Sequence, residues 1–371
     1  MGMKKNTVSV TVVTHNSEPF LARCLDSLLA QDWAPLEVIV VDNASQDGTA
    51  SILAGYQSRL QTTFNSENRG FAAAQNQAIR KANGDWVLAL NPDVVLDSDF
   101  VSHLVHAGNR NPGIGTVCGK LLSASPNFEV SPERRLDSAG IYFTPTFRHF
   151  DRGMHLPDGE EYNGAAFVFG ATAAAALYRN RMIQDITVEG EFFDEDFFLY
   201  REDADVSWRA QLQGWQCLYL PEAVGYHVRR VFPGRRQEIP EEINRHCVKN
   251  RFLMRIKNAT LPLYLRNFLP ATARDIGILA YCLLAERKSL GAFSFVLRNL
   301  RRTLAKRRII QKRRRVSNSY LQNWFRFRPV TAPVGNSLSQ QLQVPEFSSS
   351  PACAALPLST AGAQSGQLTQ L

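Results

Sequence analysis

An aspartate follows an apolar run typical of a buried strand in the segment GDWVLALNPDVVLD, residues 84–97. The run ends in Asn91, Pro92 and Asp93, and a turn alone can explain these residues, because Asn and Asp tolerate turn geometry and Pro fixes its own φ. The alternative is a metal site. A carboxylate cannot stabilise phosphate oxygens directly, but it can hold a divalent cation that bridges them. Asp93 is therefore a candidate metal ligand.

A second group of acids lies in the segment FFDEDFFLYREDADVSWRAQLQGW, residues 192–215, among aromatic side chains. The acids are Asp194, Glu195, Asp196, Glu202, Asp203 and Asp205. A helical pattern begins near Glu202, and acids at a helix N-terminus complement the helix dipole, which accounts for some of them. A carboxylate beside apolar surface and other carboxylates can act as a general base near neutral pH. The segment is therefore a candidate source of a catalytic base.

A histidine ends the strand pattern CLYLPEAVGYHV, residues 217–228. A lone histidine is more often structural, and that is the plainer interpretation of His227. Because it follows a strand in the same half of the chain as the acids, His227 can also join Asp93 as a metal ligand.

Strand and helix patterns alternate along the first 90 residues, and the elements that they predict must position the candidate residues. Apolar runs at 8–13, 36–42 and 86–90 are typical of strands, and a weaker strand is expected at 61–66. The segment EPFLARCLDSLLAQ between the first two runs has leucines at helical spacing. Nearly all-apolar strands indicate a parallel sheet covered on both faces by helices. The predicted fold class is α/β, with a doubly wound, mainly parallel sheet flanked by helices.

Polar groups follow three of these strands where each strand ends. The groups are Thr14 with Asn16, Asp42 with Asn43, and Asn91 with Asp93. Each residue taken alone is explained as well by a cap or a loop hydrogen bond. Ligands of such sheets bind outside the carboxyl ends of the strands, however, so the three groups are expected to converge on one crevice.

That crevice can hold a nucleotide without the usual phosphate-binding loops. No GxGxxG follows the first strand, and no GxxxxGK(S/T) is present in the sequence. Asp42 can accept a hydrogen bond from a pyrimidine imide or a ribose hydroxyl, and the loop Asn68-Arg69-Gly70 offers backbone N–H groups at a helix start.

The composition is that of an ordinary globular protein. With 371 residues, 44% of them hydrophobic, the chain can bury one large core or two modest ones. The six cysteines form no CxxC pair, which fits a reducing cytosol. The N-terminal segment MGMKKNTVSV lacks the apolar part of a secretory signal. The run IGILAYCLLA at 276–285 is shorter than the roughly 20 residues of a membrane span, so a core or interfacial helix is expected there.

Positive charge is concentrated near the C-terminus. The net charge is +8, and residues 298–315 contain ten Lys or Arg and no acid. Leu300, Leu304, Ile309 and Ile310 interrupt them at helical spacing, which predicts a basic amphipathic helix. Such a helix suits anionic lipid headgroups. A solvated helix is the plainest interpretation and nucleic acid is the rival partner, although the lack of aromatic residues disfavours RNA, so no nucleic acid is expected.

Five stretches of the sequence resemble the family 2 glycosyltransferases with the GT-A fold, particularly the bacterial branch of rhamnosyltransferases and galactofuranosyltransferases. They are TVVTHNSEPFLARCLDSLLAQ, EVIVVDNASQDGT, NRGFAAAQNQAI, GDWVLALNPDV and FDEDFFLYREDADVSWRAQLQGW, in the family's order across residues 8–230. The resemblance implies a GT-A domain at 1–240. A C-terminal amphipathic basic helical region is expected at 241–328, and residues 329–371 have the composition of a disordered tail.

The resemblance also implies an activity and a set of site residues. The implied reaction is metal-dependent transfer of a sugar, with inversion, from a nucleoside diphosphate to a hydroxyl of a lipid-linked or cell-surface glycan. The expected donor is dTDP-rhamnose, followed by UDP-sugars, and the expected cofactor is Mg²⁺ or Mn²⁺. The residues that match catalytic positions are Asp203 with Glu202, and those that match metal ligands are Asp93, in a version of the DxD motif, and His227. The residues that match nucleotide-binding positions are Thr14, Asn16, Asp42, Asn68, Gly70, Asn76 and Asn91.

Two other classes of function are compatible with these residues. A non-catalytic basic protein that keeps the fold would bind a membrane surface or nucleic acid. A nucleotidyltransferase uses similar metals but leaves Glu202 and Asp203 without a role. For the transferase, the basic segment 298–315 predicts a cytoplasmic protein held at the inner face of the cytoplasmic membrane.

Overall fold

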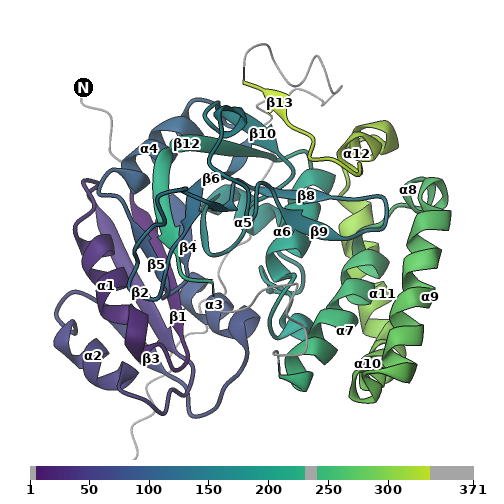
Figure 1. The fold of residues 1–371 in the computed structure, drawn as a ribbon, viewed down its shortest axis with the longest axis horizontal. Coiled ribbons are helices and arrows are strands. Elements are labelled where there is room, and N and C mark those ends of the chain that lie inside the picture. The colour runs from purple at the N-terminus through teal and green to yellow at the C-terminus, as the bar shows by residue number, and fades with distance from the viewer. Residues whose placement is uncertain (1–5, 230–239, 335–371) are drawn as a thin grey trace, which may run out of the picture.

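The computed structural model describes residues 6–229 and 240–334, which form a large central sheet with helices around it (Figure 1). The strands are β1 Val8–Thr14, β2 Leu36–Asp42, β3 Gln61–Phe64, β4 Trp86–Leu90, β5 Val94–Leu96, β6 Ile114–Ser123, β7 Leu136–Ser138, β8 Ile141–Phe143, β9 His149–Asp151, β10 Ala166–Val168, β11 Ala175–Arg179, β12 Gln216–His227 and β13 Ala332–Pro333. The α-helices are α1 Glu18–Leu29, α2 Thr49–Gly55, α3 Phe71–Ile79, α4 Phe100–Asn109, α5 Asn180–Ile186, α6 Glu202–Leu212, α7 Glu241–Asn258, α8 Leu261–Arg266, α9 Phe268–Leu284, α10 Gly291–Arg298, α11 Leu300–Lys312 and α12 Asn318–Trp324.

The first four strands form a parallel half of the sheet, in the order β3-β2-β1-β4. Every residue of β1 and β4 is buried, as expected for strands that are covered on both faces. The bounds of β2 and β4 coincide with the apolar runs predicted at 36–42 and 86–90. Because these strands are parallel, their carboxyl ends lie along one edge of the sheet.

The other half of the sheet is mixed. β11 is antiparallel to both β4 and β6, whereas β6 and β12 are parallel. β10 and β13 extend this edge beyond β12 in antiparallel pairing. The predicted α/β fold with a doubly wound, mainly parallel sheet is confirmed, and the antiparallel insertion of β11 is a feature that the apolar runs did not predict.

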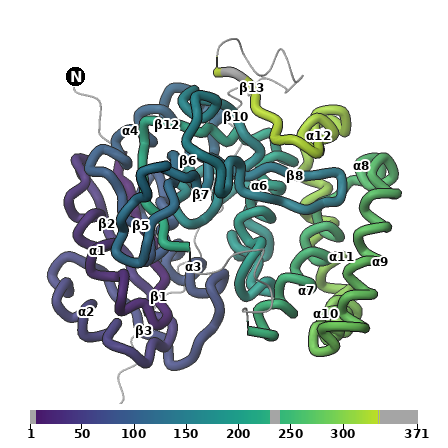
Figure 2. Tube along the Cα trace, viewed as in Figure 1, coloured from purple at the N-terminus to yellow at the C-terminus, as the bar shows by residue number. Residues whose placement is uncertain are grey.

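The C-terminal helices pack against α6 on one side of the sheet (Figures 1 and 2). Trp208 of α6 shares a hydrophobic core with Leu253 of α7, Ile310 of α11 and Trp324 of α12. The predicted C-terminal helical extension is confirmed, and its side chains complete the core beneath α6.

Helix α9 contains the apolar run predicted to form a core or interfacial helix. Leu269, Ile276 and Leu284 are 78%, 64% and 84% exposed, so this helix presents an apolar face at the surface. Across residues 6–229 and 240–334, no helix combines the length and apolarity that a membrane crossing requires.

The predicted disordered tail begins with an ordered segment. Ala332 and Pro333 form β13 and pair with β10, because the chain returns from α12 to the free edge of the sheet. The prediction of disorder over 329–371 is therefore wrong at β13, and its part from residue 335 onward lies outside the described residues.

Candidate active site

Asp42 is fixed at the end of β2 by its neighbours. Its Oδ1 accepts a hydrogen bond of 2.7 Å from the hydroxyl of Thr14 at the end of β1, and its Oδ2 accepts one of 3.1 Å from the backbone N–H of Ser45. The side-chain Oδ1 of Asn16 accepts from the backbone N–H of Gln46 at 2.8 Å. The loops after β1 and β2 are thus tied together, and the predicted strand-end group is assembled.

The predicted Asn/Gly loop lies next to this group. The side-chain amide of Asn43 donates to Oδ1 of Asn68 at 2.8 Å, and the same oxygen accepts from the backbone N–H of Gly70 at 2.9 Å. Gly70 has φ +81°, and a Cβ there would lie 2.5 Å from the ring of Phe198. Only glycine fits this approach, which packs the loop against the segment that leads into α6.

Asn76 is used inside the protein. Its amide donates to the carbonyl of Phe193 at 2.8 Å and to the carboxylate of Glu195 at 3.1 Å, and its oxygen accepts from the N–H of Phe193 at 3.0 Å. The side chain therefore holds the loop before α6 in place. Asn91 is anchored through its backbone N–H, which donates to Ala174 at 2.9 Å.

Asp93 and His227 face one another where β4 and β12 end. Nε2 of His227 lies 3.5 Å from Oδ1 of Asp93. This buried oxygen has no hydrogen-bond partner among the described residues. Within the described ranges, no group of three or more His, Cys, Asp or Glu side chains is arranged to hold a metal. A cation here would therefore take its remaining ligands from substrate phosphates and water, as Mg²⁺ often does, and the free oxygen of Asp93 fits that demand.

The second ring nitrogen of His227, Nδ1, belongs to a network of charged side chains that the sequence did not predict. Nδ1 of His227 is 2.7 Å from Asp137, which also accepts from Arg229 at 2.7 Å, and Arg229 donates to Asp151 at 2.8 Å. Although burial opposes the charge, Asp137 and Asp93 raise the pKa of His227 to about 10. The ring is thus protonated in this state, and metal binding at Nε2 requires loss of that proton.

Asp203 lies in the first turn of α6 and is the predicted catalytic base. Its Oδ1 accepts from the backbone N–H of Ala204 at 2.7 Å. Burial and the negative charge of Asp151 raise its pKa to about 6, against the opposing effects of backbone N–H groups and Arg229. Such a carboxylate is ionised at neutral pH and still basic enough to accept a proton.

Glu202 differs from its neighbour. Its side chain is buried, and Oε2 has no hydrogen-bond partner among the described residues. Burial and the charges of Asp203 and Asp205 raise its pKa well above the ordinary value. These effects favour the neutral form of Glu202, so of the two predicted catalytic acids Asp203 is the better suited to act as a base.

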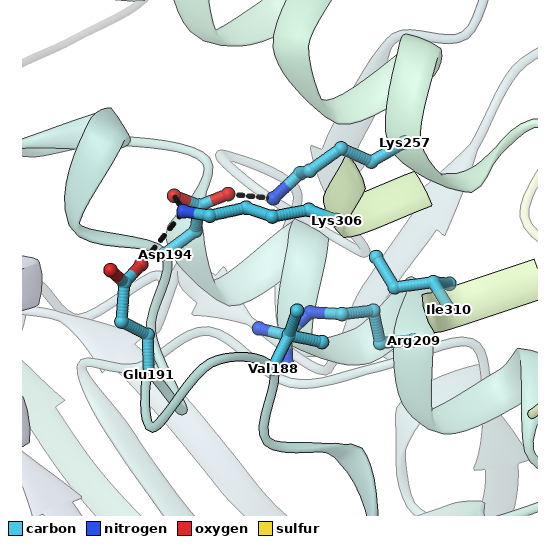
Figure 3. A pocket seen from close by; sticks show the side chains of 7 residues that line it. All are labelled: Val188, Glu191, Asp194, Arg209, Lys257, Lys306 and Ile310. Carbon is cyan, nitrogen blue, oxygen red and sulfur yellow. Dashed lines mark hydrogen bonds and ion pairs between the residues drawn. The ribbon is translucent and has the colours of Figure 1, made fainter. Parts of the chain in front are cut away.

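Three other acids of this segment form ion pairs with the C-terminal helices or within α6. Asp194 binds Lys257 of α7 and Lys306 of α11, the latter at 2.7 Å, and Figure 3 shows both lysines reaching this carboxylate. Asp196 also pairs with Lys306, and Asp205 pairs with Arg209 at 2.8 Å. These three acids hold structure in place, so they are not candidates for the catalytic base.

The predicted residues come together as two adjoining groups. Arg229 links the first group: it shares Asp137 with His227, which faces Asp93, and its charge acts on Asp203. The charges of Arg229 and Asp93 both act on Tyr200, whose pKa burial raises. The second group is Asp42, Thr14, Asn68 and Gly70, which joins the first through Phe198.

The N-terminal part of the chain matches a known protein family. Residues 9–175 match the family model described as Glycosyl transferase family 2. The poly-beta-1,6-N-acetyl-D-glucosamine synthase of Staphylococcus epidermidis is 23% identical over 219 residues, which cover 58% of this chain and 48% of that protein. The chain spans about half the length of the curated relatives it matches.

Two solved structures have a similar fold. GalNAc-T7 with UDP, GalNAc and Mn²⁺ superposes with a TM-score of 0.55 at 13% identity, covering 69% of this chain and 48% of that chain. TarS of S. aureus in complex with UDP-GlcNAc superposes with a TM-score of 0.50 at 17% identity, covering 82% and 90% of the two chains. The family match, together with polar residues at the ends of β1, β2 and β4, identifies residues 9–175 as a glycosyltransferase domain of family 2.

Proposed function

We propose that the protein transfers a sugar from a nucleoside diphosphate to a hydroxyl of a glycan, with inversion at the anomeric carbon. The observation that carries this proposal is the position of Asp203, a carboxylate with a raised pKa, in the charge network that also contains Asp93 and His227. This pairs a base with a diphosphate-binding position. The non-catalytic and nucleotidyltransferase alternatives leave the base without a role.

In the proposed mechanism Asp203 accepts the proton of the acceptor hydroxyl as that oxygen attacks the anomeric carbon, opposite the departing diphosphate. A single displacement inverts the configuration. Asp93 and His227 would hold Mg²⁺ or Mn²⁺, and the bound cation supplies positive charge that offsets the charge on the leaving diphosphate. The residues proposed to bind the nucleoside and its phosphates are Thr14, Asn16, Asp42, Asn68, Gly70 and Asn91. Asn76 matches the same set by resemblance, but its side chain is bound to Phe193 and Glu195, so it is proposed to position the loop beside the donor.

The donor proposed first is dTDP-rhamnose, followed by UDP-sugars, and the acceptor is a lipid-linked or cell-surface glycan. UDP-GlcNAc is added to these UDP-sugars because TarS was crystallised with it and because the matched synthase is named for a polymer of N-acetylglucosamine. A panel of dTDP-rhamnose, UDP-galactofuranose, UDP-GlcNAc and GDP-mannose should be assayed for release of the nucleotide and for thermal stabilisation of the protein. Turnover of a dTDP- or UDP-sugar supports the proposal. If the protein turns over none of these donors and is stabilised by none of them, the result favours the non-catalytic alternative.

The pH dependence of the reaction follows from Asp203. Its pKa lies at about 6, so the base is protonated below that pH and ionised above it. We expect kcat/KM to rise between pH 5 and 7 with a midpoint near 6, and then to level off. A profile measured at constant ionic strength that stays flat over this interval contradicts the role of Asp203.

We also propose that residues 298–315 attach the protein to an anionic membrane surface. Several of its cations are used inside the protein: Lys306 binds Asp194, Arg307 donates to carbonyls of Ile256 and Ala259, and Arg315 pairs with Asp185. Arg313 is exposed but donates to the carbonyl of Thr187. The cations that remain exposed, with neither an ion pair nor a side-chain hydrogen bond among the described residues, are Arg298, Arg301, Arg308 and Lys312. Exposed Leu297 and Leu304 accompany them, a combination that suits anionic lipid.

Replacement of these four cations by Gln should release the protein from vesicles that contain phosphatidylglycerol. Each cation near the surface contributes about 1 kcal/mol, so the loss of four is expected to abolish co-sedimentation. A deletion of the whole segment is unsuitable, because Ile310 belongs to the core beneath α6. The double variant Arg59→Gln/Arg110→Gln, at exposed positions in the N-terminal part of the chain, serves as the control. Unchanged co-sedimentation of the quadruple variant removes this proposal.

A further inference from the structure

Five arginines gather beside the start of α6. They are Arg148 next to β9, Arg201 before α6, Arg251 and Arg255 on α7, and Arg274 on α9. Arg201 donates to Nδ1 of His149 at 3.2 Å and to the carbonyl of Cys247 at 3.1 Å. The charges of Arg201 and Arg274 act on both Arg148 and Arg251, and that of Arg255 acts on Arg251, so guanidinium groups from distant segments lie near one another. One of them, Arg201, directly precedes Glu202 in the sequence.

One carboxylate serves two members of this arginine cluster. Asp275 of α9 lies 3.2 Å from Arg251 and 2.5 Å from Arg255. Arg251 also donates to the carbonyl of Thr146 at 2.8 Å, and the guanidinium of Arg148 stacks over the ring of Phe150 at 4.1 Å. The contacts orient the side chains but leave the cluster strongly positive.

Buried donors of the cluster lack acceptors. Within residues 6–229 and 240–334, Nη1 of Arg251, Nη1 of Arg255 and Nε of Arg274 are buried without a hydrogen-bond partner. The side chain of Arg251 is only 2% exposed. An unsatisfied buried donor is costly, and more so when it is charged. The guanidinium of Arg255 packs over the rings of Phe147, Phe252 and Tyr264, which accounts for part of its environment. The nitrogens of Arg251 and Arg274 therefore carry the inference of a ligand that accepts hydrogen bonds and carries negative charge.

The electrostatics agree with this geometry. Burial and the charges of Arg274 and Arg201 lower the pKa of Arg148 to about 10. Burial, together with Arg201, Arg255 and Arg274, lowers the pKa of Arg251 to about 9, although Asp275 opposes the shift. The guanidinium groups thus repel one another, and an anion bound among them would relieve that repulsion.

We propose that the arginine cluster binds a phosphate or diphosphate group of the acceptor substrate. Guanidinium groups bind phosphate oxygens with paired, charge-assisted hydrogen bonds. Arg201 is followed directly by Glu202 and Asp203, so an acceptor held here by its phosphate would lie near the start of the helix that carries the proposed base. Arg148, Arg201 and Arg274 are partly exposed and therefore within reach of a ligand. This inference rests on the proposed transferase function and specifies an anionic, phosphate-bearing acceptor.

The first test is calorimetric titration of the full chain with inorganic pyrophosphate at constant ionic strength. The variant is Arg148→Gln/Arg274→Gln, which spares the buried ion pairs of Arg251, and the control is Arg59→Gln/Arg110→Gln, which removes the same charge from exposed positions. We expect the cluster variant to bind pyrophosphate about tenfold more weakly or worse, and the control to bind as the wild-type protein does. Equal binding by all three proteins, or no binding by the wild-type protein, overturns the proposal.

The second test separates the acceptor from other sources of phosphate. With a phosphate-bearing acceptor, the cluster variant should raise the acceptor KM about tenfold or more without a matching rise in the donor KM, and Arg148→Lys should restore part of the loss. A rise in the donor KM alone assigns the cluster to the donor and overturns the proposal. So does displacement of pyrophosphate by phosphatidylglycerol vesicles, which assigns it to a lipid headgroup. Failure of the wild-type protein to use any donor would contradict the transferase function, whereas the pyrophosphate titration still reports on the cluster.

Discussion

Replacement of Asp203 by Asn is expected to lower kcat for sugar transfer by about 10²–10⁴-fold, the range over which a general base contributes. Asn has the same shape and its oxygen can still accept from the N–H of Ala204, so the start of α6 is preserved. Only the ability to take the acceptor proton is lost.

The stability of the Asp203→Asn variant distinguishes lost chemistry from lost structure. Folding raises the pKa of Asp203 from 3.8 to about 6. Its stabilising effect is present below pH 3.8 and lost as the pH rises through 6, so the ionised carboxylate opposes folding at neutral pH. The variant should melt at or above the wild-type temperature at pH 7.5. Asp99→Asn, at an exposed helix start, is the control and should retain full activity. Transfer by Asp203→Asn at the wild-type rate contradicts its role as the base.

Asp93→Ala is expected to lower transfer at saturating metal by about 100-fold or more, because charge stabilisation of a leaving diphosphate is worth several kcal/mol. The buried Oδ1 of Asp93 has no hydrogen-bond partner in the described part of the chain, and its removal takes from the fold the 3.5 Å charge contact with His227. His227 keeps its contact with Asp137 at 2.7 Å.

The metal dependence of the Asp93→Ala variant carries the second half of this prediction. The concentration of Mn²⁺ or Mg²⁺ that gives half-maximal rate should rise at least about tenfold, measured by titrating EDTA-treated protein. Asp99→Ala serves as the matched control. A variant with wild-type rate and wild-type metal requirement shows that Asp93 does not hold the cation.

The parts of the site that sequence patterns predicted are those set by local structure. The apolar runs at 36–42 and 86–90 became β2 and β4 with the same bounds, and parallel pairing then brought the ends of both strands to one edge. Asp42 meets Thr14 there because the two residues are paired in register. Such contacts follow from strand type and direction alone.

The parts that escaped prediction depend on contacts between distant segments. Arg229 reaches Asp137 and Asp151 across 92 and 78 residues, and both acids lie in short strands without a distinctive pattern. Lys306 looked like a membrane-facing cation, yet it is buried against Asp194, 112 residues away. Pairings between such distant residues leave no periodic pattern in the sequence. The number of cations in the segment 298–315 is therefore larger than the number that stays available to a binding partner.

The central claim is that Asp203 drives a single displacement on a nucleotide-sugar donor. The measurement that tests it most directly is the anomeric configuration of the transferred sugar, read by NMR in the product of the first donor in the panel that the wild-type protein accepts. A configuration opposite to that of the sugar in the donor is the predicted result. Retention of the donor configuration would contradict the claim, because it requires a mechanism other than one attack assisted by a base.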